Sequence, residues 1–154
     1  MQYKIHHDYS NDNIDVFYND KLYMKVERHF NFWNKMTSVF TIDDKIILKS
    51  TYDVVWFQQK ISITYQNLDS ILSLVKNKGR YYLKVDNLSI ILKYHYFKNP
   101  IRTLVDNNII IGRIETELFS IIGPQIYFVS LDCKKEHELY CLIRFCLELK
   151  SAGD

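Results

Sequence analysis

The stretch HELYCLIRFCLELK, residues 137–150, constrains the fold more than any other part of the chain. It holds no Gly or Pro and shows no period-two alternation, which predicts a helix over residues 135–150. Its apolar side chains cover most of the circumference, and only His137, Arg144 and Glu148 share a narrow polar wedge. A helix resting on one sheet needs an apolar stripe of only ~100° or somewhat more. Residues 139–149 are too few to span a bilayer, so we expect protein on all sides of this helix.

The rest of the chain predicts β-strands, because apolar and polar residues alternate between short turns. A single alanine, Ala152, argues against a helical bundle, while abundant Tyr, Phe, Ile, Val and Thr suit strands. Segment 70–75 is ambiguous, since Leu68, Ile71, Leu72 and Val75 also fit one face of a helix. The expected strands are 2–8, 14–18, 22–30, 37–42, 46–57, 61–66, 70–75, 80–85, 88–97, 101–106, 109–119 and 126–132.

An internal repeat divides these strands into two sets of six. An offset of 66 residues places Asp20 on Asp86, His29 on His95 and Thr37 on Thr103. The offset then becomes 63, which places DDKIIL (43–48) on DNNIII (106–111), and later 65. We therefore expect a mainly β fold, an antiparallel barrel of about twelve strands built from two six-strand halves around the hydrophobic C-terminal helix. Residues 1–150 would form one domain, with 151–154 as a tail.

Composition and charge narrow the class of protein. The 154 residues are 47% hydrophobic and 25% charged, as expected of a soluble globular protein. The net charge of +2 is spread along the chain without a basic stripe, so we expect no nucleic acid as a partner. The N-terminus lacks the apolar core of a signal peptide, and the cysteines Cys133, Cys141 and Cys146 show no metal-type spacing. These features predict a cytoplasmic protein with reduced, buried thiols.

Two pairs of hairpin sequences and one closing segment resemble the tubby C-terminal-like superfamily, which includes the tubby domain, the phospholipid scramblases and the LURP-one-related proteins. They are the hairpin sequences YNDKLYMKV and VDNLSIILK, the hairpin sequences DDKIILK and DNNIIIGRI, and the closing LYCLIRFCLEL, which spans 139–149. The resemblance covers essentially the whole chain, as one of strand rhythm and order. It implies a barrel around a central helix and a binding module for anionic phospholipid. The phosphate-binding residues of tubby do not map onto this sequence, so none is carried over.

Motifs for catalysis or metal binding are missing from the sequence. The glycines lie too far apart for a phosphate-cradling loop, and no nucleophile elbow or paired-histidine metal box is present. His6 and His7 would point to opposite faces of a strand. Cys141 and His137 are spaced for a thiol–imidazole contact, but a nucleophile sealed inside a barrel could not reach a substrate. We expect no enzyme activity, no cofactor and no metal.

Two segments are candidate binding sites. Lys76, Lys78 and Arg80 form the densest basic run and could attract an anionic lipid surface, or be no more than a solvated face. Phe30, Phe32 and Trp33 lie in a connecting segment and could anchor a protein partner, or plug one end of the barrel. We therefore expect a non-enzymatic, cytoplasmic binding module of tubby-like type for a protein partner or an anionic phospholipid. The alternative function is a protein-interaction factor, such as an immunity or adaptor protein, with an unrelated all-β fold.

Arg144 and Glu148 pose a separate question, because an enclosed arginine needs a partner. The simpler expectation is that this wedge faces a gap between strands and stays in contact with water. If the pair is enclosed instead, Arg144→Ala would cost on the order of 3–5 kcal/mol of stability.

Overall fold

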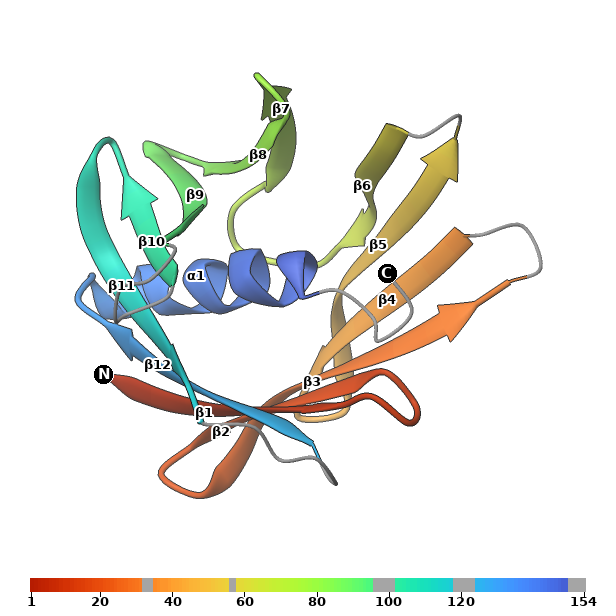
Figure 1. Ribbon diagram of the computed structural model, residues 1–154, viewed down its shortest axis with the longest axis horizontal. Helices are drawn as coiled ribbons and strands as arrows, with labels where there is room; N and C mark the ends of the chain where they lie inside the picture. The colour runs from red at the N-terminus through yellow and green to blue at the C-terminus, as the bar shows by residue number, and fades with distance from the viewer. Residues whose placement is uncertain (32–34, 56–57, 96–101, 118–123, 150–154) are drawn as a thin grey trace.

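A computed structural model describes residues 1–31, 35–55, 58–95, 102–117 and 124–149 (Figure 1). The strands alternate with short turns, and the described helix closes the chain. The strands are β1 (Gln2–Asp8), β2 (Asn13–Tyr18), β3 (Lys21–Phe30), β4 (Lys35–Ile42), β5 (Lys45–Val55), β6 (Gln58–Gln66), β7 (Ser73–Asn77), β8 (Arg80–Val85), β9 (Leu88–Tyr94), β10 (Arg102–Asp106), β11 (Ile109–Thr116) and β12 (Gln125–Leu131), and the helix is α1 (Lys135–Glu148).

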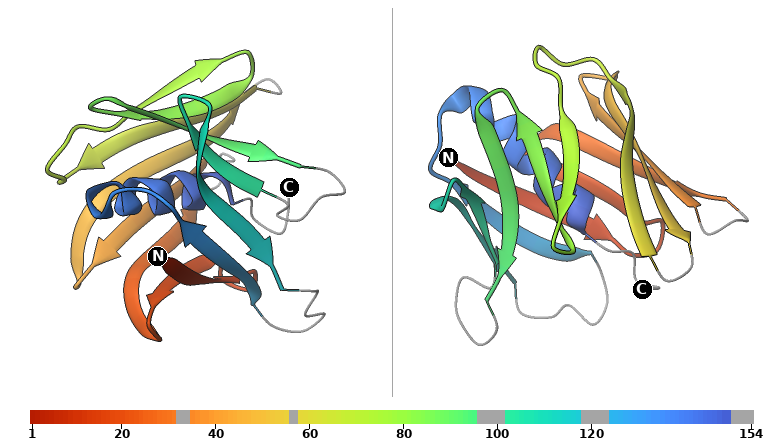
Figure 2. Two further views of the ribbon diagram at one scale, coloured as in Figure 1. Left: turned by 90° about the vertical axis from the view of Figure 1, so that its left-hand side faces the viewer. Right: turned by 90° about the horizontal axis from the view of Figure 1, so that it is seen from above.

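The strands form one twelve-stranded sheet in the order β6-β5-β4-β3-β2-β1-β12-β11-β10-β9-β8-β7. Each half of the chain is therefore an antiparallel meander of six strands. The first and last strands, β1 and β12, join the two halves in register from Gln2↔Ser130 to His7↔Gln125. The sheet curls into a nearly closed barrel with α1 inside it, as two perpendicular views confirm (Figure 2). The predicted fold class, two six-strand halves around the C-terminal helix, is confirmed.

Two-residue turns explain the sharp hairpins. Asp43–Asp44 joins β4 to β5 and Asn107–Asn108 joins β10 to β11, and all four residues have positive φ. Asp and Asn tolerate this left-handed conformation better than other non-glycine residues. Two successive positive φ values define the hairpin turn whose twist matches that of paired strands.

These turns correct the alignment of the repeat. The turns start at residues 43 and 107, and each hairpin has a break in register just before its turn, after Phe40 and after Leu104. Both features are thus offset by 64 residues, whereas the sequence comparison used 66 for Thr37 onto Thr103 and then 63. The identity of Thr37 and Thr103 does not mark equivalent positions, because turns and bulges define the register of a hairpin more directly than residue identity does.

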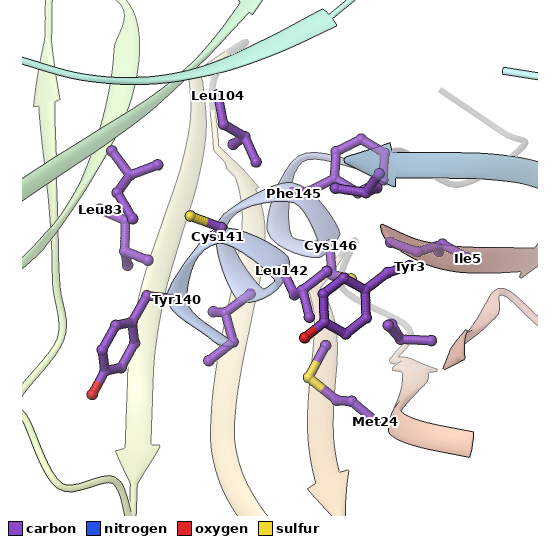
Figure 3. Packing of buried hydrophobic residues seen from close by; sticks show 14 of the residues in the cluster. Tyr3, Ile5, Met24, Leu83, Leu104, Tyr140, Cys141, Leu142, Phe145 and Cys146 are labelled. Atoms are coloured by element: carbon purple, nitrogen blue, oxygen red, sulfur yellow. The ribbon is translucent and has the colours of Figure 1, made fainter. Parts of the chain in front are cut away.

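The helix forms the centre of the core. Seven consecutive residues, Tyr140 to Cys146, are buried, so every side of the helix is covered. The covering side chains come from opposite parts of the barrel: Ile5 and Met24 on one side, Leu83 and Leu104 on the other (Figure 3). Burying one large apolar side chain contributes ~1.5–3 kcal/mol, so this arrangement is a major source of stability.

Several element boundaries differ from the expectation, among them the end of the helix and the start of β7. The helix ends at Glu148, not at residue 150, because Leu149 is extended, with φ −65° and ψ 117°. Strand β7 covers Ser73–Asn77, not 70–75. The reason is Gln66, whose side-chain amide accepts from Leu72 N at 2.7 Å and donates to Leu72 O at 3.2 Å. This amide takes the place of a neighbouring strand, and Leu72 packs into the core. The expected strand residues 56–57, 96–97, 101 and 118–119 lie outside the described part of the chain.

Candidate functional site

The barrel has one seam that strand pairing does not close. The repeat equates the junction β1–β12 with a junction β6–β7, yet β6 and β7 are the two ends of the sheet. Tyr81 spans this seam with its side chain: its hydroxyl accepts from Ile61 N at 3.0 Å and donates to Gln59 O at 2.9 Å. Lys76 Nζ also donates to Gln59 O, at 3.0 Å. Among the described residues, side chains thus replace the backbone ladder along this seam.

A pocket of about 480 Å³ lies between the seam and the C-terminal half of α1. Four of its lining residues are cationic: Lys76, Arg80, Lys93 and Arg144. Among the described lining residues, Glu148 alone is acidic. Its apolar wall includes Met36, Leu92, Leu147 and Leu149. The volume lies within the range of small-molecule sites, and the charge balance favours an anion.

Two of the three predicted basic residues belong to this pocket. Lys76 and Arg80 line it, while Lys78 sits in the β7–β8 turn with φ 47° and is not part of its lining. Lys93 was missed in the sequence. The sequence could have indicated it, because Arg80 and Lys93 are equally far from the Asp86–Asn87 turn between β8 and β9. Residues equally far from a hairpin turn lie opposite each other on the two strands.

Arg144 is enclosed, with 1% of its surface exposed. Its Nη2 donates to Tyr81 O at 2.9 Å, and its Nη1 forms an ion pair with Glu148 one turn further along the helix. Its Nε has no hydrogen-bond partner among the described groups. The expectation that the polar wedge faces a gap between strands is confirmed, but the expectation that Arg144 stays wet is wrong. Tyr81 and the helix itself cover it, and Glu148 is the member of the pair that reaches solvent.

A second buried network lies where α1 ends. Arg28 donates through Nη2 to the carbonyl oxygens of Cys146 at 2.9 Å and Leu149 at 2.6 Å. Its Nη1 donates to Asp12 Oδ1 at 3.1 Å, and the same oxygen lies 2.6 Å from His7 Nε2. All three side chains of this network are buried. Since Leu149 also lines the pocket, Arg28 holds one wall of the site in place.

The aromatic candidates are only partly described. Phe30 ends β3 and is 60% exposed. Phe32 and Trp33 lie outside the described residues. The predicted aromatic cluster therefore stays a prediction, with one member placed at the surface.

Cys141 contacts another cysteine, Cys133, whereas its spacing in the sequence suggested a contact with His137. Cys133 Sγ lies 3.9 Å from Cys141 Sγ, and all three cysteines are free thiols. This contact lowers the pKa of the Cys133 thiol, because Cys141 stabilises its thiolate by hydrogen bonding. Burial raises the pKa of Cys146 to about 12. His137 instead lies 3.5 Å from Glu136.

The described residues hold no group of three His, Cys, Asp or Glu side chains placed to bind a metal ion. Nor is any helix in the described part of the chain long and apolar enough to cross a membrane.

Fold and site together define a mainly β protein: a nearly closed twelve-stranded barrel around a C-terminal helix, with a cationic pocket at its open seam. Comparisons with models of protein families, with curated proteins and with solved structures each found no match to the chain.

Proposed function

We propose that this protein is a non-enzymatic, cytoplasmic, tubby-like binding module whose ligand is an anionic phospholipid held at the seam pocket. The observation that carries the proposal is the convergence of Lys76, Arg80, Lys93 and Arg144 on one pocket whose described lining contains a single carboxylate. Three of these cations come from the β7–β8–β9 segment and one from α1, so distant parts of the chain build the site together.

The pocket suits a phospholipid for two reasons. Lys76 and Arg80 belong to an exposed hairpin, where cations attract an anionic surface by ~1 kcal/mol each. Met36, Leu92 and Leu147 add apolar surface next to the charges, so a ligand with both an anionic head and apolar parts would be matched.

Liposome sedimentation tests this function. We expect the protein to sediment with vesicles that contain phosphatidylserine, to stay in solution with phosphatidylcholine alone, and to be released by salt. The variant Lys76→Gln/Arg80→Gln should bind roughly 30-fold more weakly, since it lacks two cations. The control Lys21→Gln/Lys45→Gln removes the same charge from the exposed first residues of β3 and β5 and should bind normally. Equal loss in both variants, or no binding at low salt, would refute the proposal.

A protein partner is the second candidate, favoured by the 60% exposure of Phe30. Large exposed aromatic side chains are frequent anchors of protein interfaces. On this reading Phe30→Ala and Trp33→Ala would each abolish capture of the partner from cell extract, while Lys76→Gln/Arg80→Gln would not. Retention of the partner by both aromatic variants would rule it out.

A further inference from the structure

We propose that Glu148 is a built-in occupant of the anion site, and that a ligand binds by replacing its carboxylate on Arg144. This inference rests on the proposed function, because it concerns how the same pocket takes its ligand. The ligand class it implies is a compact anionic head, phosphate or carboxylate, attached to an apolar body.

Arg144 has the features of a fixed anion receptor. It is 1% exposed, and its Nη2 is anchored to the backbone oxygen of Tyr81 at 2.9 Å. A guanidinium has five N–H donors in a rigid fork that matches a carboxylate or phosphate. In Arg144 the Nε donor has no partner among the described groups, although the residue lines the pocket. Replacement of Glu148 by an anion would occupy Nη1, and the N–H of Nε remains as a further donor to a group in the pocket.

Glu148 is the member of the pair that can leave. Its side chain is 27% exposed against 1% for that of Arg144. It is the last residue of α1, and Leu149 after it is already extended. A flexible acidic side chain at a helix end can turn toward solvent, whereas Arg144 is held by the backbone of β8.

The exchange also explains why an acid belongs in a cationic pocket. A buried arginine without a counter-charge would be strongly destabilising, so an empty pocket needs Glu148. An entering anion supplies that counter-charge itself, and Lys76, Arg80 and Lys93 then surround it. The apolar wall of Met36, Leu92 and Leu147 would contact the ligand's apolar body. Glu148 therefore competes with every ligand and sets the affinity of the site.

The test compares Glu148→Gln with wild-type protein by calorimetry, using inorganic phosphate and soluble dihexanoyl phosphatidic acid as probes. Glutamine can still accept a hydrogen bond from Arg144 but no longer competes as a charge. We expect at least about tenfold tighter binding of the lipid by the variant. The control Glu115→Gln makes the same change in net charge on exposed β11 and should stay within about twofold of wild type.

A second measurement follows the wild-type protein directly. Addition of dihexanoyl phosphatidic acid should shift the NMR signals of the Arg144 Nε–H group and of the Glu148 carboxylate carbon, and leave that of the Glu115 carboxylate unchanged. This readout does not depend on how stable the Glu148→Gln variant is.

Equal binding by Glu148→Gln and wild type, or an unmoved Glu148 signal on saturation, would overturn the inference. If vesicle binding still depended on Lys76 and Arg80 in that case, the proposed function would stand without it. If neither protein bound any probe or vesicle, both would fall. If inorganic phosphate bound as tightly as dihexanoyl phosphatidic acid, the inference that the ligand carries an apolar body would be wrong.

Discussion

Arg28 shows how one side chain can connect the barrel to the helix. The last carbonyl groups of a helix lack partners within it and carry partial negative charge. The last turn of α1 contains no basic residue, so Arg28 from β3 supplies the donors for Cys146 O and Leu149 O. Asp12 balances the charge of Arg28 inside the protein. Three separate segments of the chain thus meet at one guanidinium.

Arg28→Ala should therefore destabilise the protein by about 3–5 kcal/mol, because Asp12 loses its charged partner and two helix carbonyls lose their donor. Urea unfolding followed by circular dichroism measures this loss. Arg113→Ala is the matched control, since Arg113 is exposed on β11 and should change stability by less than about 0.5 kcal/mol. Similar losses for the two variants would mean that the network contributes nothing.

Two buried acids predict how stability depends on alkaline pH. Burial raises the pKa of Cys146 from 9.0 to about 12. Burial and the 2.7 Å hydrogen bond to the Glu138 carboxylate raise the pKa of Tyr3 above its usual 10.0. A raised folded pKa means that the stabilisation is complete below the unfolded pKa and is lost as the pH rises toward the folded pKa.

The free energy of unfolding should accordingly fall above pH 9, first through Cys146 and above pH 10 also through Tyr3. Each group contributes a slope of at most about 1.4 kcal/mol per pH unit. Urea titrations at several pH values measure the slope, which Cys146→Ala and Tyr3→Phe should each reduce. An unchanged slope in both variants would show that these groups do not titrate differently in the folded and unfolded states.

For single residues, the sequence predicted clusters of charge along the chain better than it predicted contacts between residues far apart in the chain. Lys76 and Arg80 stand out because they are neighbours along the chain, and the structure brings both to the pocket. Arg28 lies in an ordinary alternating strand, and its partners Asp12 and Leu149 are 16 and 121 residues away. No local pattern encodes such contacts, because they depend on how the sheet closes.

Among the elements, the seam between β6 and β7 is held by side chains where the rest of the sheet uses backbone. The side chain of Gln66 hydrogen-bonds to the backbone of Leu72, and the hydroxyl of Tyr81 hydrogen-bonds to the backbone of Gln59 and Ile61. A neighbouring strand would otherwise pair with these backbone groups. A hydrogen-bonded edge also resists pairing with other chains. The seam can thus stay open to a ligand without exposing a free template for aggregation.

Tyr81→Phe keeps the ring and removes the two hydrogen bonds that the Tyr81 hydroxyl makes across the seam. We expect a loss of about 1–2 kcal/mol and faster hydrogen exchange at the amide of Ile61, with the amides of β1 unaffected. The control is Tyr65→Phe, because Tyr65 is 44% exposed on β6, the strand that contains Ile61. Exchange at Ile61 that does not respond to Tyr81→Phe would show that the hydroxyl does not hold the seam.

The order of the strands was predictable because alternation and turn residues are local signals. The prediction of a strand over residues 70–75 was wrong at both ends, and β7 starts later because the Gln66 side chain pairs with the backbone of Leu72. The repeat was found, but its offset was wrong, since bulges after Phe40 and Leu104 shift the register in a way that residue identity does not record.

For the whole molecule, one helix decides the architecture. Its apolar circumference predicted a surrounding wall, and the sheet supplies it with side chains from both halves. The open seam was not predictable in the same way, because the repeat alone would make β6 pair with β7 as β12 pairs with β1. The polar wedge of His137, Arg144 and Glu148 on an otherwise apolar helix was the sign in the sequence of a break in that wall.

The most direct test of this architecture is cysteine labelling of the native helix. Single-cysteine proteins would carry the thiol at Cys141, Leu142→Cys or Ile143→Cys, which point to three sides of α1, about 100° apart. If the barrel encloses the helix, labelling at all three positions should require the same free energy as global unfolding in urea. Rapid labelling at any one position in the folded protein would mean that this side of the helix faces solvent, and would contradict the account.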